Sequence, residues 1–137
     1  PILKEFVAFN PDGNFSDPEY IGTVSNQNLH AAGQPDMVIV THPNFLTAAN
    51  KLANFHAQSQ GFDVFVTTPQ AIYNEFSSGK QDISAIRNFM KMLFDRAQGD
   101  TDLIPRYLLL FGDGSFDVAG RTSAGASNFV PSFQSHE

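Results

Sequence analysis

Hydrophobic residues along this chain fall into two patterns, and the two patterns alternate. Continuous apolar runs predict strands at residues 36–43, 62–69 and 106–112, and the first two have the β-branched composition of strands that are covered on both faces. Between the runs, apolar residues recur every three or four positions, as on one side of an amphipathic helix. This alternation predicts crossover connections, and therefore an α/β fold of three layers with a mostly parallel sheet between helices.

Proline and glycine bound the first predicted helix. Pro43 suits a first helical turn, because its fixed φ is helical and its missing N–H would have no partner there. Gly61 supplies the stop, since glycine readily adopts the left-handed conformation that ends many helices. Ala48 and Phe55 flank a stripe of residues at helical spacing, which consists of Phe45, Ala49, Leu52 and His56.

Two further helices are predicted before the third strand. Thr68 and Pro69 form an N-cap and first-turn pair for a short helix that runs to residue 76. The clearest helix covers residues 82–98 and ends at Gly99. Its apolar stripe consists of Ile83, Ile86, Met90, Leu93 and Ala97, widened by Phe89 and Phe94. Its charged side chains are expected to face solvent, and they are Arg87, Lys91, Asp95 and Arg96.

The two ends of the chain have weaker patterns. Residues 2–9 are β-prone, and the next eleven residues are rich in turn formers. Residues 128–134 predict a fourth strand, at a sheet edge because Pro131 cannot donate to a ladder. We therefore divide the chain into a leading strand and irregular segment, residues 1–35, and a parallel α/β subdomain, residues 36–137.

Composition and charge narrow the range of partners. The chain has 137 residues, 42% of them hydrophobic, and a net charge of −6, which fits one globular unit with one core. Phosphate backbones and anionic membranes demand clustered Lys and Arg. The sequence has no such cluster, so we expect neither nucleic acid nor membrane as a partner of this segment. It also contains no leader and no apolar run of about 18 residues, the length that a bilayer span needs.

Cysteine is absent from the sequence. Disulfides, thiolate nucleophiles and zinc–thiolate sites are therefore excluded within this chain, and no motif indicates a metal or another cofactor. The chain begins at Pro1 within sequence that has a structured pattern, and it ends just after an apolar run. We expect it to be a segment of a longer protein.

The loops that follow the strands are the expected place for function. Ligands of open α/β sheets gather beyond the carboxyl ends of the strands, where loops carry side chains and helix N-termini present their amides. Here the strands lead into residues 41–44, 67–70 and 112–117. In a parallel sheet these three loops share one edge.

The loop after the third strand has the sequence GDGSFD and allows several interpretations. It lacks the Lys of a P-loop, and Asp113 would repel a phosphate. It resembles the start of GDSL esterases, but Gly114 occupies the position of the nucleophile and Ser115 is displaced by one. Asp113 and Asp117 could contribute to a calcium site, although local oxygen ligands are few. In a purely structural interpretation, Gly112 and Gly114 permit tight backbone geometry and the two carboxylates accept hydrogen bonds from amides.

Four histidines are the other candidates for chemistry. His42 follows the first strand and could approach Asp113 to form an oriented acid–base pair, although a loop histidine with a satisfied hydrogen bond is the alternative. His56 occupies a helix stripe and is expected to be a half-buried packing residue. His30 lies in an irregular segment and His136 near the end of the chain, and no spacing predicts a metal site. Our candidates for the cleft edge are His42, Asp113, Gly114 and Asp117.

Longer motifs resemble a known family. The stretches at residues 25–30, 36–56, 66–97 and 106–117 together look like the gingipain family of cysteine peptidases, and within it the branch of cell-surface signal peptidases, or sortases, of type IX secretion. The resemblance implies a caspase-like α/β fold with two subdomains, of which this chain is the first. It places the Cys nucleophile and the His base on the second subdomain. No catalytic residue therefore carries over to this chain.

The resemblance also implies different roles for this chain and for the rest of the parent protein. This chain is expected to be a non-catalytic scaffold, inactive alone, in an exported parent at the outer membrane or cell surface that processes C-terminal signals. Its expected partners are the second subdomain and, in the full-length protein, a peptide substrate. Two alternatives from other classes remain: a flavodoxin-like protein-interaction module, and a small-molecule hydrolase that uses Ser115 and His42.

Overall fold

The structure is a computed structural model. The residues that it describes are 10, 13, 19–20, 22–24, 26–115 and 128–132. The strand predicted at residues 2–9, and the candidates Asp117 and His136, lie outside the described residues.

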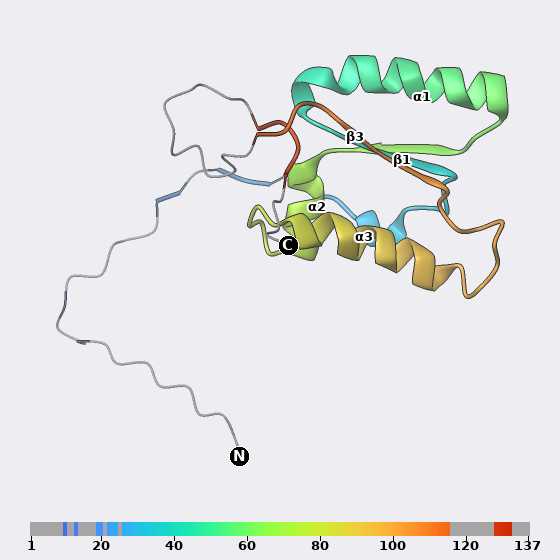
Figure 1. The fold of residues 1–137 in the computed structure, drawn as a ribbon. Coiled ribbons are helices and arrows are strands. Elements are labelled where there is room, and N and C mark those ends of the chain that lie inside the picture. The colour runs from blue at the N-terminus through green and yellow to red at the C-terminus, as the bar shows by residue number, and fades with distance from the viewer. Residues whose placement is uncertain are drawn as a thin grey trace, which may run out of the picture.

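Three parallel strands form the sheet, in the order β2-β1-β3 (Figure 1). They are β1 (Met37–Thr41), β2 (Val64–Thr67) and β3 (Tyr107–Phe111). Met37 of the central strand stands opposite Val64 on one side and Tyr107 on the other. The predicted parallel sheet is therefore confirmed, and the structure adds the order of its strands.

The helices begin and end close to the predicted positions. Two short 3₁₀ helices, η1 (Leu29–Ala31) and η2 (Pro43–Phe45), accompany α1 (Leu46–Gln60), α2 (Pro69–Phe76) and α3 (Ile83–Arg96). Gly61 ends α1 with a φ of 71°, in the left-handed conformation that its type favours. Thr68 caps α2, because its side chain accepts a hydrogen bond from the N–H of Ala71. The last helix ends at Arg96 with Ala97 as its C-cap, slightly before the predicted end.

Helices cover both faces of the sheet and define two apolar cores. Figure 1 shows α1 on one face, and α2 and α3 on the other. The α1 face buries Met37, Ile39, Ala49 and Ala53. The opposite core is larger and joins the sheet and η1 to α2 and α3, with buried members Leu29, Val38, Val40, Ile72, Tyr73, Ala85, Ile86, Phe89 and Leu93. No helix in the described part of the chain is both long and apolar enough to span a bilayer.

The structure corrects three predictions of burial and one of secondary structure. Phe55, Phe94 and Ile83, all assigned to helix stripes, are 61%, 57% and 38% exposed, because the buried face of each helix is narrower or shorter than its predicted stripe. The described part of the fourth predicted strand, residues 128–132, is irregular. The N–H groups of Phe129 and Val130 both donate to the carbonyl of Asp113, and Pro131 has no N–H to continue a ladder.

Candidate functional site at the carboxyl edge of the sheet

All three strands end at the same edge, as predicted, because both strand pairs are parallel. The loops there are residues 41–44, 67–70 and 112–115, and the segment 128–131 joins them. This segment is held by the carbonyl of Asp113, which accepts the N–H of Phe129 at 2.9 Å and that of Val130 at 3.2 Å. The sheet edge is thus closed by a piece of chain that is distant in sequence.

His42 lies at the centre of an aromatic cluster. Its Nδ1 accepts a hydrogen bond from the backbone N–H of Asn44 at 3.3 Å, which caps η2. Its ring centroid is 4.9 Å from that of Phe129 and 6.3 Å from that of Phe45. Phe45 and Phe129 are themselves 4.9 Å apart in an edge-to-face arrangement, which is favourable for aromatic pairs. His42 is therefore fixed by packing and by a local hydrogen bond.

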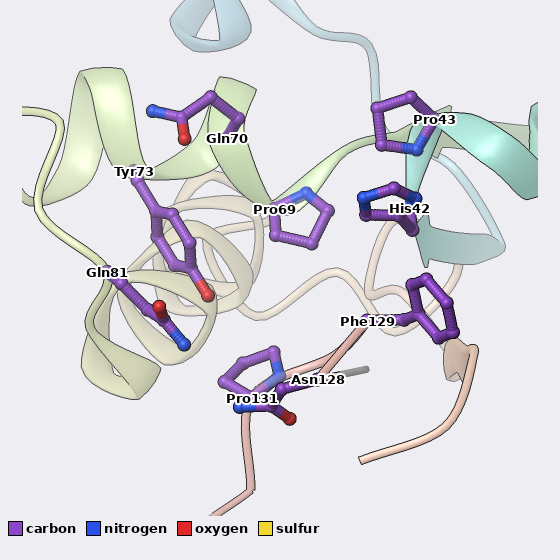
Figure 2. Close-up of a pocket in the computed structure, with 9 residues that line it drawn as sticks. All are labelled: His42, Pro43, Pro69, Gln70, Tyr73, Gln81, Asn128, Phe129 and Pro131. Atoms are coloured by element: carbon purple, nitrogen blue, oxygen red, sulfur yellow. The ribbon is translucent and has the colours of Figure 1, made fainter. Parts of the chain in front are cut away.

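A pocket of about 320 Å³ opens beside this cluster (Figure 2). Its wall combines rings with amide side chains, and the lining residues are His42, Pro43, Pro69, Gln70, Tyr73, Gln81, Asn128, Phe129 and Pro131. None of the nine carries a fixed charge. The amide Nδ2 of Asn128 is buried and has no hydrogen-bond partner among the described residues. The pocket therefore offers neutral hydrogen-bonding groups on an apolar frame, as a binding or supporting surface would.

Tyr73 provides a hydroxyl group at this pocket. Figure 2 shows its ring coming from α2, with the hydroxyl on the side of Gln81. Burial raises the pKa of Tyr73, and the negative charge of Asp82 raises it further. Both effects keep the phenol protonated, so Tyr73 can donate and accept hydrogen bonds but is a poor base.

The two glycines of the GDGS loop are explained by close packing. A Cβ atom on Gly112 would lie 3.0 Å from Cβ of Phe129, and one on Gly114 would lie 3.3 Å from the carbonyl oxygen of Val130. Both distances are shorter than ordinary contact. The glycines therefore let residues 128–130 approach the loop, which supports the structural interpretation of this motif.

Substitution of Gly112 by alanine is expected to loosen the 128–130 segment. The new methyl group must displace Phe129, and the φ of 157° at this position is strained for any residue with a Cβ, so we expect a combined cost of about 1–3 kcal/mol. We also expect faster amide exchange at Phe129 and Val130, measured by NMR. Gly22→Ala is the matched control, because Gly22 has a similar φ of 150° and a Cβ there meets nothing within 4 Å. Unchanged exchange in the Gly112 variant would contradict the packing argument.

The predicted pair of His42 and Asp113 is not formed in the structure. No ion pair or hydrogen bond joins these two side chains in the described part of the chain, where His42 contacts Asn44 instead. Asp113 is exposed and acts through its backbone carbonyl. Sequence placed both residues at one edge, but it did not give the direction of their side chains. His42 lines the pocket, whereas Asp113 and Gly114 are not part of its lining and contact the 128–132 segment instead.

Ser115 is buried and bound to the same segment. Its N–H donates to Oδ1 of Asn128 at 3.1 Å, and its carbonyl accepts the hydroxyl of Ser132. These contacts give it a structural role beside the pocket. Within the described residues, no cluster of three or more His, Asp or Glu side chains could hold a metal ion.

The other two described histidines, His30 and His56, do not line this pocket. His56 is half-buried as predicted and lies 6.2 Å from the ring of Phe62 in a stacked arrangement. His30 binds Glu75 on α2, with 2.7 Å between His30 Nδ1 and Glu75 Oε2. The same carboxylate accepts hydrogen bonds from the N–H of Leu29 and from the side chain of Gln27. Glu75 therefore fastens residues 27–30 to α2.

Sequence reasoning missed most of the pocket wall. Pro69 and Gln70 belong to the loop at residues 67–70 that the sequence predicts at the carboxyl edge, but neither residue is among the named candidates. Tyr73 follows Pro69 by one turn on α2, a spacing that could have indicated it. Gln81 and Asn128 come from loops, and nothing in their local sequence predicts that they meet.

Comparison with known proteins agrees with this fold. The model of peptidase family C25 matches residues 30–137. The crystal structure of dimeric latent PorU from Porphyromonas gingivalis is 36% identical in sequence and superposes with a TM-score of 0.75. That match covers 85% of this chain and 12% of the PorU chain, so the chain spans about an eighth of that relative. Comparison with curated proteins finds no match. The family match extends over most of the chain, and the chain therefore belongs to peptidase family C25, the gingipain family.

Proposed function

We propose that this chain is the non-catalytic first subdomain of a gingipain-like cysteine peptidase. One observation carries the proposal: the C25 family match covers residues 30–137, yet the 137 residues contain no cysteine. A cysteine peptidase needs a thiolate to attack the peptide carbonyl and a base to accept its proton. The nucleophile and its base then come from another part of the parent protein.

The carboxyl edge supplies support for that missing part. Its loops are joined to one another by aromatic contacts around His42 and by the hydrogen bonds of the Asp113 carbonyl. Its pocket carries no fixed charge, and the pKa of Tyr73 is raised, which keeps the phenol protonated. These properties favour packing and positioning over proton transfer. In this proposal residues 36–137 form the subdomain, with residues 1–35 as its leading segment.

The finer part of the proposal concerns substrate and location. Similarity to PorU, together with the motifs that resemble signal peptidases of type IX secretion, supports an exported parent at the cell surface. Its substrates are C-terminal signals of secreted proteins, and its chemistry is hydrolysis or transfer of the acyl group from the thiolate.

A peptidase assay tests the proposal. The full-length gene product that carries this chain is incubated with a peptide that spans a C-terminal signal junction, with and without iodoacetamide. We expect cleavage that alkylation abolishes, and no cleavage by the 137-residue chain alone. Ser115→Ala in the full-length protein is the control, and we expect it to retain its activity because Ser115 is not a reactant.

Two results would overturn the assignment. Turnover by the 137-residue chain alone, insensitive to alkylation, would place a reaction centre within it. Loss of peptide cleavage on Ser115→Ala with an unchanged fold would favour a reaction centre built on Ser115 and His42 instead of a thiolate.

A further inference from the structure

The pocket beside His42 is small and offers no opposite charge to an ion. Its volume of about 320 Å³ lies at the lower end of the range for ligand pockets, so it suits one side chain better than a large cofactor. None of its lining residues carries a fixed charge. Asp82 follows Gln81 in sequence, but its carboxylate accepts the N–H and the hydroxyl of Ser84 and caps α3. An ion would lose its water in this pocket without gaining a counter-charge, so a neutral group is favoured.

His42 and Asn128 supply hydrogen-bond donors to the pocket. Nδ1 of His42 accepts the N–H of Asn44, so the proton of the neutral imidazole is on Nε2. Figure 2 shows one ring nitrogen of His42 on the side of Pro69. Oδ1 of Asn128 accepts the N–H of Ser115, and its buried Nδ2 has no partner among the described residues. A small side-chain movement, of the kind that is common on binding, brings that nitrogen to a ligand.

Gln70 supplies the complementary acceptor. It is an exposed residue in the first turn of α2, and its Nε2 donates to Oδ1 of Asn74 at 2.8 Å. Nδ2 of Asn74 in turn donates to Oε1 of Gln27 at 3.2 Å. These bonds use the nitrogen of the Gln70 amide and leave its Oε1 available within the described part of the chain. The pocket therefore combines donors on one side with an acceptor from α2.

A primary carboxamide matches this combination. It has one carbonyl acceptor and two N–H donors, whereas a carboxylate has no donor and an ammonium group has no acceptor. An alkyl or thioether side chain would leave the polar groups of the pocket unpaired. The apolar part of the wall suits the methylene groups that carry a carboxamide in asparagine or glutamine, and it consists of Pro43, Pro69, Phe129 and Pro131.

We infer that this pocket is a recognition site for the carboxamide side chain of an asparagine or glutamine in a peptide. The carbonyl of that side chain accepts a hydrogen bond from Nε2 of His42, and its N–H donates to Oε1 of Gln70. The inference rests on the proposed function for the peptide itself, because a peptidase parent brings peptides to this edge of the sheet. It adds a preference at one position of that peptide.

Blocked amino acids test the inference without any need for catalysis. The N-acetyl, N-methylamide derivatives of glutamine, glutamate, lysine and methionine have side chains of similar length but different end groups. Each is titrated into the nitrogen-15-labelled 137-residue chain, and the NMR shifts of the amides of Gln70, Tyr73 and Phe129 are followed. We expect the glutamine derivative to bind at least about tenfold more tightly than the other three, because only its end group makes both hydrogen bonds.

Two substitutions of Gln70 make the test specific, and both lie at an exposed position where the fold tolerates them. Gln70→Met keeps the length of the side chain but removes the acceptor, so the preference for glutamine should fall at least about fivefold. Gln70→Glu sets a carboxylate at the same place and should shift the preference to the lysine derivative, because a counter-charge is then present. Gln58→Met, at an exposed position of α1, is the matched control and should bind as the wild type does.

The outcomes separate this inference from its rivals. Equal binding of the four derivatives, binding of none of them, or a glutamine preference that survives Gln70→Met would overturn it. Tighter binding of free L-glutamine than of the blocked derivative would assign the pocket to a free amino acid and would also overturn it. A glutamine preference in this chain, together with a full-length protein that lacks alkylation-sensitive cleavage, would keep the recognition site and remove the proposed function.

Discussion

Replacement of Phe89 by alanine is expected to lower the free energy of unfolding of this chain by about 3–5 kcal/mol. Phe89 is fully buried at the centre of the larger core. Its ring lies 5.5 Å from that of Phe76 on α2 and 6.0 Å from that of Phe65 on β2. Removal of the ring leaves a cavity where three elements meet, and the rigid surroundings close it only in part.

Phe94 offers a matched control on the same helix. It is the same residue type but 57% exposed, so Phe94→Ala should change the free energy of unfolding by no more than about 0.5 kcal/mol. Urea denaturation of the 137-residue chain, followed by circular dichroism, measures both variants. Equal losses for the two substitutions would contradict the described core.

Replacement of Glu75 by glutamine is the second large expected effect. The carboxylate is 15% exposed and accepts hydrogen bonds from Gln27, Leu29 and His30. Glutamine keeps the shape but loses the charge and one acceptor. Hydrogen bonds to charged groups contribute about 1.5–3 kcal/mol, and solvent screening reduces this value, so we expect a loss of about 2 kcal/mol at pH 7. We also expect faster amide exchange at Leu29.

The loss should depend on pH. Partial burial favours the neutral acid, but the hydrogen bonds from Leu29, Gln27 and His30 outweigh it and lower the pKa of Glu75 from 4.5 to about 2. A folded-state pKa below the unfolded value stabilises the fold above the unfolded pKa. The contribution is therefore complete above about pH 5 and is lost as the pH falls towards 2.

Urea titrations of wild type and Glu75→Gln from pH 7 to pH 2.5 measure this dependence. The difference between the two proteins should narrow on acidification. Asp95→Asn is the control, because Asp95 belongs to an exposed pair with Lys91 and such pairs contribute little. A constant difference across the range would show that charge on Glu75 is not the cause.

Patterns among neighbouring residues were sufficient to predict most of the helices and strands. The apolar run of β1, the cap at Thr68 and the stop at Gly61 each depend on neighbouring residues, and each appears in the structure. The parallel sheet followed from the alternation of elements, and so did the common edge of the loops. His42 could be placed at that edge for the same reason.

Features that depend on distant residues could not be predicted in this way. Glu75 meets Leu29 across 46 residues of sequence, and a single acid on a short helix gives no local sign of such a contact. Periodicity assigned Phe89 and Phe94 to one stripe, but only the position of α3 over the sheet decides which of them is buried. The segment at residues 128–132 has strand composition. Two hydrogen bonds to the carbonyl of Asp113 nevertheless hold it in an irregular conformation.

The central position of β1 has a consequence for synthesis of the chain. This strand is made first, but its partner β3 lies seventy residues downstream, as the hydrogen bond from Thr41 to Phe111 illustrates. At typical translation speeds, β1 must wait roughly 4–14 seconds for that partner to be made. During this interval the apolar strand β1 has one edge without a partner. A chaperone that binds the nascent chain at this stage would give this polypeptide the greatest protection against aggregation.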